Sequence, residues 1–80
     1  MLRYMDLHRM QIGNAISHLV RQPLFDLPGG TTYKADFMYM MSTWDGWTVV
    51  VEDCKGYRTP AYIKAKKQVE AIYGISIVET

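Results

Sequence analysis

The chain has 80 residues, of which 49% are hydrophobic, and its formal net charge is only +1. This composition is too apolar for a disordered tail, and the length fits one small domain over residues 1–80. One cysteine excludes an internal disulfide, and no signal peptide or long apolar run is present, so we expect a soluble cytoplasmic protein with no membrane partner.

The first expected element is a helix over residues 2–11, where apolar side chains recur at helical spacing until a Gly-Asn pair ends the pattern. A helical turn near 14–17 and then an edge strand over 18–27 follow in this interpretation. Pro23 favours the strand over a helix, because proline kinks a helix but is tolerated on an edge strand.

The middle of the chain predicts a β-hairpin. The first strand covers residues 33–41, and one of its faces would carry Tyr33, Ala35, Phe37 and Tyr39. The Asp-Gly pair at 45–46 is a strong hairpin signal between strand-prone runs, and the second strand covers residues 48–55. Trp44 and Trp47 flank this turn, and we interpret them either as a cross-strand pair or as a platform for base stacking.

A second helix begins where Thr59 is a good N-cap and Pro60 an ideal first helical residue. It runs to Tyr73 and ends at Gly74, a residue suited to the left-handed terminating conformation. A short strand at 75–78 follows, so strand, helix and strand can form a right-handed crossover. The predicted class is α/β with a mixed sheet, in the order helix, three strands, helix, strand (αβββαβ).

Positive charge is concentrated in the segment from 55 to 67, which contains no acid. Such a segment attracts a polyanion, although a solvated helix face explains its lysines equally well. The exposed lysines of the second helix are expected to be Lys64, Lys66 and Lys67. The candidate contacts to nucleic-acid phosphates are Lys34, Arg58, Lys64 and Lys67.

Acids at the two hairpin strands predict a metal site. Aspartate is unfavourable in an apolar strand unless it is paired or binds something, yet Asp36 lies within one strand and Asp53 closes the next. Oxygen ligands for Mg²⁺ or Mn²⁺ would come from Asp36, Asp53 and the backbone carbonyl of Cys54. Lys55 points to the same side as Asp53, where its ammonium would stabilise negative charge during phosphodiester hydrolysis. An ordinary ion-pair cluster of these acids with Lys34, Lys55 or Arg58 is the alternative.

The motif Asp36…Asp53-Cys54-Lys55 resembles the signature of the PD-(D/E)XK nucleases, with Ala35 in place of the usual proline. With its flanks at 33–37 and 51–59, and with the lysine-rich helix that follows, the chain is similar to small phage-encoded endonucleases of this superfamily. More distantly it resembles the Holliday-junction-resolving endonucleases of bacteriophages, which work as dimers.

The resemblance implies a minimal restriction-endonuclease-like core and metal-dependent cleavage of DNA, selective for branched or junction structures. It also implies a homodimer in the cytoplasm of a host cell. The catalytic residues carried over by the motif are Asp36, Asp53 and Lys55.

The chain departs from this family at its first helix, where members usually carry a glutamate just before the pair that matches Arg3-Tyr4. No glutamate precedes Glu52 here, so Asp6 and Glu52 are the reserve metal ligands. An alternative function is therefore a catalytically impaired nucleic-acid-binding or assembly protein on a nuclease fold. A protein-interaction module with Met- and Trp-rich surfaces is a third, weaker hypothesis. Nothing marks the thiol of Cys54 as an activated nucleophile.

Overall fold

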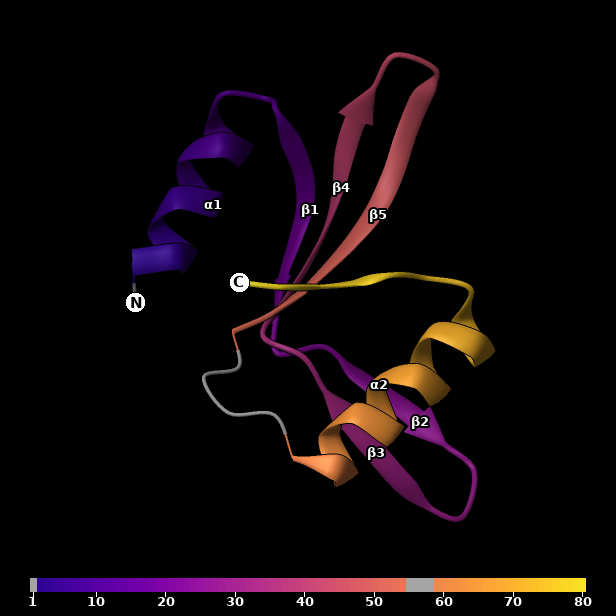
Figure 1. Cartoon of the computed structure of the whole chain (residues 1–80). Helices are drawn as coiled ribbons and strands as arrows, with labels where there is room; N and C mark the ends of the chain where they lie inside the picture. The colour runs from indigo at the N-terminus through magenta and orange to yellow at the C-terminus, as the bar shows by residue number, and fades with distance from the viewer. Residues whose placement is uncertain (1, 55–58) are drawn as a thin grey trace.

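The structure, a computed structural model, describes residues 2–54 and 59–80. Over these residues the chain forms two helices and six strands (Figure 1). Their bounds are α1 Leu2–Ile12, β1 Ile16–Arg21, β2 Leu24–Leu27, β3 Thr31–Lys34, β4 Phe37–Thr43, β5 Gly46–Asp53, α2 Pro60–Tyr73 and β6 Ile77–Glu79. The predicted mixed α/β class is confirmed, and so are the two predicted helices.

Four strands make one mixed sheet in the order β1-β4-β5-β6, whereas β2 and β3 pair in a small sheet of their own. β1, β4 and β5 are antiparallel neighbours, and β6 runs parallel to β5. Parallel neighbours need a crossover connection, and α2 lies in the one that joins β5 to β6. Five strands precede α2 instead of the three expected, because two of the predicted strands are each divided.

The two divisions face each other and form a shared kink at residues 22–23 and 35–36. Gln22 has a φ of 53°, and Pro23 has no N–H to offer to a ladder. The backbone N–H of Gln22 donates to Asp36 O at 2.8 Å, and that of Ala35 donates to Pro23 O at 3.1 Å. The paired strands therefore bend together and pass from one sheet to the other. Three sequence predictions are wrong here: a helical turn near 14–17, and unbroken strands over 18–27 and 33–41.

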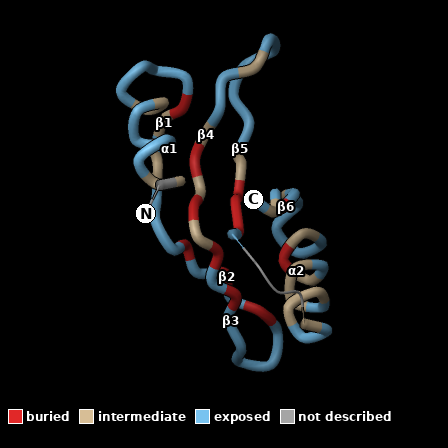
Figure 2. The backbone as a smooth tube through the Cα atoms, turned by 60° about the vertical axis from the view of Figure 1, so that its left-hand side comes forward, coloured by how far each residue is buried: buried red, intermediate tan, exposed pale blue. Residues whose placement is uncertain are grey.

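Two apolar clusters lie on opposite faces of the four-stranded sheet, because Phe37 pairs with Glu52 and therefore faces away from Val51. Figure 2 shows α1 and α2 on either side of the buried stretches of β4 and β5. The α1 cluster consists of Leu7, Ile16, Phe37 and Tyr39. The α2 cluster consists of Phe25, Leu27, Tyr33, Ala35, Val51, Val69 and Ile77. The sequence predicted one shared face for Tyr33, Ala35, Phe37 and Tyr39. That prediction is wrong, because the kink puts the first two in the α2 cluster and the last two in the α1 cluster.

The predicted hairpin between β4 and β5 is confirmed, and it projects from the body of the molecule (Figure 1). Its last pair is Thr43 with Gly46. Trp47 lies opposite Ser42, while Trp44 is in the turn and is 96% exposed. The two tryptophans therefore do not form the cross-strand pair that the sequence allowed.

Helix α2 has the ends that its sequence predicts. Thr59 Oγ1 accepts a hydrogen bond from the backbone N–H of Tyr62 at 3.1 Å, and Pro60 is the first helical residue. Gly74 adopts the left-handed conformation, with φ 66°, and its N–H donates to Glu70 O at 3.1 Å. No helix among the described residues is long and apolar enough to cross a membrane.

Candidate active site

Asp36 lies at the shared kink, and its carboxylate reaches the end of β5. Its backbone N–H donates to Glu52 O at 3.1 Å, and its Oδ2 accepts a hydrogen bond from the backbone N–H of Cys54 at 2.5 Å. These bonds fix the carboxylate against the backbone that joins Asp53 to Cys54. The kink therefore brings Asp36 next to the segment that carries the second acid of the motif.

Asp53 is the last residue of β5, and its side chain is fully buried, with 0% exposure. Its Oδ2 accepts a hydrogen bond from the hydroxyl of Tyr33 on β3. Burial, and then the bond to Asp53, raises the pKa of Tyr33 well above its ordinary value, so this hydroxyl remains a donor at neutral pH. The carboxylate is therefore oriented by a neutral group from the small sheet.

Aromatic and charged side chains continue from Asp53 towards α2. The ring of Tyr33 stacks on that of Tyr62, with 6.2 Å between centroids. The hydroxyl of Tyr62 donates to Glu79 Oε2 at 3.1 Å, and Lys66 Nζ lies 3.4 Å from Glu79 Oε1. Burial, with a further contribution from Glu79, raises the pKa of Tyr62 to about 12. Lys66 was expected on the exposed side of the helix, and this is wrong, because its side chain folds onto Glu79 and is only 18% exposed.

Glu52 precedes Asp53 on β5 and points to the other face of the sheet, where it is 1% exposed. Arg3 on α1 binds both of its oxygens, with Nε 2.7 Å from Oε1 and Nη2 2.5 Å from Oε2. The hydroxyl of Tyr39 also donates to Oε2. Burial works to raise the pKa of Glu52, but the bonds from Arg3 and Tyr39 outweigh it, and the pKa is lowered. Glu52 is therefore an ionised acid that ties α1 to β5.

The remaining candidates for catalysis and metal binding do not gather around the two aspartates in the described part of the chain. Lys55 and Arg58 lie outside the described residues. Cys54 is exposed, and Asp6 is exposed on α1, where it forms an ion pair within the helix. Among residues 2–54 and 59–80, no three His, Cys, Asp or Glu side chains form a group that could hold a metal ion.

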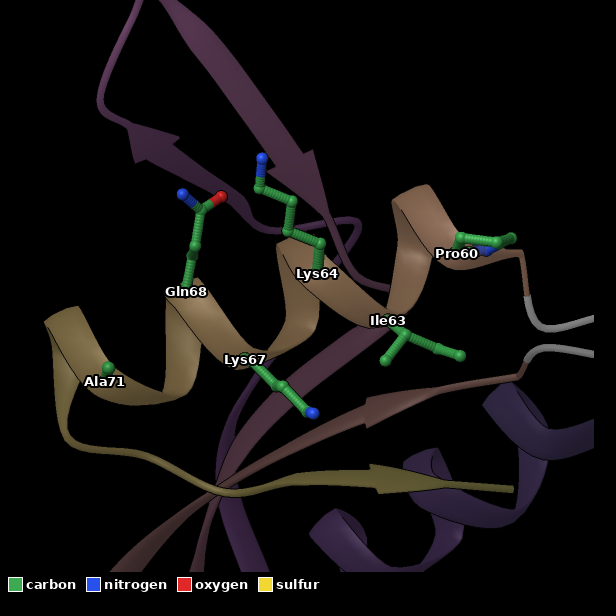
Figure 3. Close-up of a pocket in the computed structure, with 6 residues that line it drawn as sticks. All are labelled: Pro60, Ile63, Lys64, Lys67, Gln68 and Ala71. Carbon is green, nitrogen blue, oxygen red and sulfur yellow. The ribbon is translucent and has the colours of Figure 1, made fainter.

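The candidate phosphate contacts that the structure describes are all exposed. Lys34 lies on β3, and Lys64 and Lys67 lie on the outer side of α2. Lys64 and Lys67 line a shallow groove of about 600 Å³ along this helix, with Lys64 and Gln68 on one side and Ile63 and Lys67 on the other (Figure 3). The groove therefore presents two ammonium groups next to an apolar surface.

Sequence reasoning did not identify the side chains that hold the buried Glu52 and Asp53 and the half-buried Glu79. These are Arg3, Tyr33, Tyr39, Tyr62 and Lys66. An acid in an apolar strand implies a hydrogen-bond partner, and the tyrosines in the predicted strand over 33–41 could have been proposed as donors. No local pattern connects Arg3 with Glu52, which is 49 residues further along the chain.

No protein-family model, curated protein or solved structure gives a significant match to this chain.

Proposed function

We propose that this chain is a metal-dependent DNA endonuclease that hydrolyses phosphodiester bonds. The observation that carries this proposal is the hydrogen bond from the Cys54 backbone N–H to Asp36 Oδ2, at 2.5 Å. It fixes one acid of the motif against the strand end that bears the other, Asp53. Two acids held at one strand end are what the spacing of the nuclease motif requires.

The donor atoms at this strand end suit a hard divalent cation. The carboxylates of Asp36 and Asp53 and the backbone carbonyl of Cys54 would hold Mg²⁺ or Mn²⁺, which prefer oxygen ligands. Such an ion supplies an activated water and neutralises charge on the phosphate. The chain's own contribution is orientation: the kink fixes Asp36, and Tyr33 orients Asp53. In this proposal Lys55 stabilises the negative charge that develops on the phosphate.

The resemblance to phage nucleases supports branched or junction DNA as the substrate and a restriction-endonuclease-like core. The proposed order αβββαβ counts β1 with β2, and β3 with β4, as one kinked strand each. Contacts to the phosphate backbone would come from Lys34, Arg58, Lys64 and Lys67. The host-cell cytoplasm is the location proposed with this function.

The test is a cleavage assay on single-stranded, duplex, flapped and four-way-junction DNA, each with Mg²⁺, Mn²⁺ or EDTA. We expect cutting that requires the metal, and a loss on the order of a hundredfold or more in Asp36→Asn, Asp53→Asn and Lys55→Ala. Asp26→Asn is the matched control, because Asp26 is an exposed acid on β2, and this variant should keep the wild-type rate.

Binding of the ion can be measured separately from turnover. Mn²⁺ should raise the Tm of the wild type and of Asp26→Asn, and the rise should be lost in Asp53→Asn, because a ligand that binds only the folded state stabilises it. Cutting that is unchanged in both Asp36→Asn and Asp53→Asn contradicts the proposal.

A second candidate function is nucleic-acid binding without cleavage. The complete burial of Asp53 favours it, together with the engagement of Glu52 by Arg3. This function predicts DNA binding that survives EDTA and no turnover with either metal. Lys64→Ala and Lys67→Ala should then weaken binding to every sequence alike and reduce its salt dependence.

A further inference from the structure

Part of β5 has an open edge on the side away from β4. β6 pairs with β5 only at Val51, Glu52 and Asp53. Within the described residues, no strand pairs with positions 46–50 on that side. In Figure 1 this stretch belongs to the hairpin that projects past β6. A bare strand edge presents backbone N–H and C=O groups to which another strand can bind.

The alternation of backbone groups shows which residues face this edge. The carbonyl of Asp53 faces the β6 side, because it accepts a hydrogen bond from Thr80 N–H at 3.1 Å. Neighbouring residues of an antiparallel strand direct their backbone groups to opposite edges. Val49 and Trp47 lie four and six residues before Asp53, so their backbone N–H and C=O groups face the same side as those of Asp53, which is the open edge. The backbone groups of Thr48 face β4.

The open stretch lacks the features that usually protect an edge. Positions 46–50 read Gly-Trp-Thr-Val-Val, with no charge and no proline, and their pairing with β4 is regular. β1, at the opposite edge of the same sheet, carries His18 and Arg21 and has a register shift between Ser17 and Val20. Charges and irregular pairing discourage strand addition. The β1 edge is therefore protected, and the open stretch of β5 is not.

We propose that β5 pairs with β5 of a second copy of this chain, antiparallel, around a twofold axis at Thr48. This register places Trp47 opposite the partner's Val49 and Val49 opposite the partner's Trp47. Residues that face the open edge then meet as hydrogen-bonded pairs, each of which exchanges two N–H···O bonds. The free stretch is symmetric about Thr48, so the pairing ends at position 50, next to the point where β6 begins.

The side chains of this register complement each other. Trp47 is 52% and Val49 is 46% exposed, and both lie on the same face of β5 as Val51 of the α2 cluster. Aromatic and β-branched residues opposite each other form favourable cross-strand pairs. The axis is perpendicular to the sheet, so both α2 helices lie on the same side of the joined sheet. The lysines of the two helix grooves would then form one basic surface.

The first test places charges on the twofold axis. Wild type should have twice the 9.3 kDa mass of one chain in sedimentation and light-scattering experiments. Thr48→Lys and Thr48→Glu should each be monomeric, because like charges lie directly opposite each other. An equimolar mixture of the two variants should be dimeric again, since lysine then faces glutamate. Ser42→Lys is the matched control: Ser42 is exposed on β4, both of whose edges are paired, and this variant should remain dimeric.

A second variant tests the backbone bonds. Val49→Pro removes an N–H that faces the open edge and leaves the ladder to β4 intact, so it should give a folded monomer. The proposal is overturned by a wild type that keeps the mass of one chain at every concentration, or by dimeric Thr48→Lys and Val49→Pro. A mixture of the two Thr48 variants that stays monomeric also overturns it. Mass is measured without DNA or metal, so the result is independent of the nuclease proposal.

Discussion

Glu52 and Asp53 are neighbours on β5, and they show two ways of burying an acid. Both are nearly inaccessible, at 1% and 0% exposure, but their side chains lie on opposite faces of the sheet. On the α1 face, Arg3 neutralises Glu52 through two hydrogen bonds, and the hydroxyl of Tyr39 adds a third. On the α2 face, the hydroxyl of Tyr33 donates a hydrogen bond to Asp53 Oδ2.

The difference lies in the side chain that holds each acid. A bidentate arginine occupies both oxygens of a carboxylate and anchors the element that carries it, here the helix α1. A tyrosine hydroxyl satisfies one oxygen and keeps the carboxylate in a fixed direction. Glu52 is thus committed to the contact between α1 and β5. Asp53 is the last residue of β5, and the backbone N–H of the next residue, Cys54, donates to Asp36.

The largest effect should come from Arg3→Ala, which leaves Glu52 buried without its cation. Removing one partner of a buried ion pair typically costs 3–5 kcal/mol, and we expect about 3 kcal/mol here, because the Arg3 side chain is 35% exposed and water reaches it. Urea unfolding followed by circular dichroism measures this loss.

The double variant Arg3→Met/Glu52→Leu provides the control for that prediction. Replacing both partners of a buried pair by apolar side chains is often nearly neutral, so the double variant should regain most of the lost stability. A double variant as unstable as Arg3→Ala would mean that the arginine acts through packing and not through its charge.

The helices could be predicted from the sequence because their signals are local. Thr59-Pro60 and Gly74 lie at the ends of α2, and each acts on the backbone within one turn. The Asp-Gly pair of the hairpin is equally local. Such elements need no knowledge of the rest of the fold.

The kink and the acid partners could not be predicted, because they depend on distant segments. The strand breaks at Gln22 and Asp36 occur side by side, because backbone hydrogen bonds join residues 22–23 to residues 35–36. Pro23 was interpreted as part of an unbroken edge strand, and the unfavourable aspartate at position 36 was interpreted as a metal ligand, so neither was taken to mark a break. The pairing of Arg3 with Glu52 likewise requires α1 to be docked on the sheet. From the sequence, Asp36 and Asp53 are therefore candidates only, and the fold was needed to find the groups that hydrogen-bond to them.

The two tyrosines allow a smaller and more direct comparison of the faces. Tyr33→Phe removes the hydroxyl from Asp53, and Tyr39→Phe removes the hydroxyl from Glu52. Hydrogen bonds to charged groups contribute about 1.5–3 kcal/mol, and we expect a loss of about 2 kcal/mol for Tyr33→Phe. Tyr39→Phe should cost only about 1 kcal/mol, because Glu52 keeps both bonds from Arg3. Equal losses of unfolding free energy in the two variants, measured by urea unfolding, would contradict the expected difference between the hydroxyl bonds of Tyr33 and Tyr39.

The smallest expected effect is a pH dependence of the unfolding free energy, which arises from Glu52 on the α1 face. The pKa of Glu52 is lowered in the folded protein, whereas in the unfolded chain it is about 4.3. The unfolded state therefore takes up the proton first, and the stabilisation by ionised Glu52 is complete above the unfolded pKa and is lost as the pH falls through the folded pKa. The difference in unfolding free energy between wild type and Glu52→Gln should be constant near neutral pH and shrink in acid. A difference that stays constant into strong acid would contradict an ionised Glu52, and with it the division of roles between the two neighbouring acids.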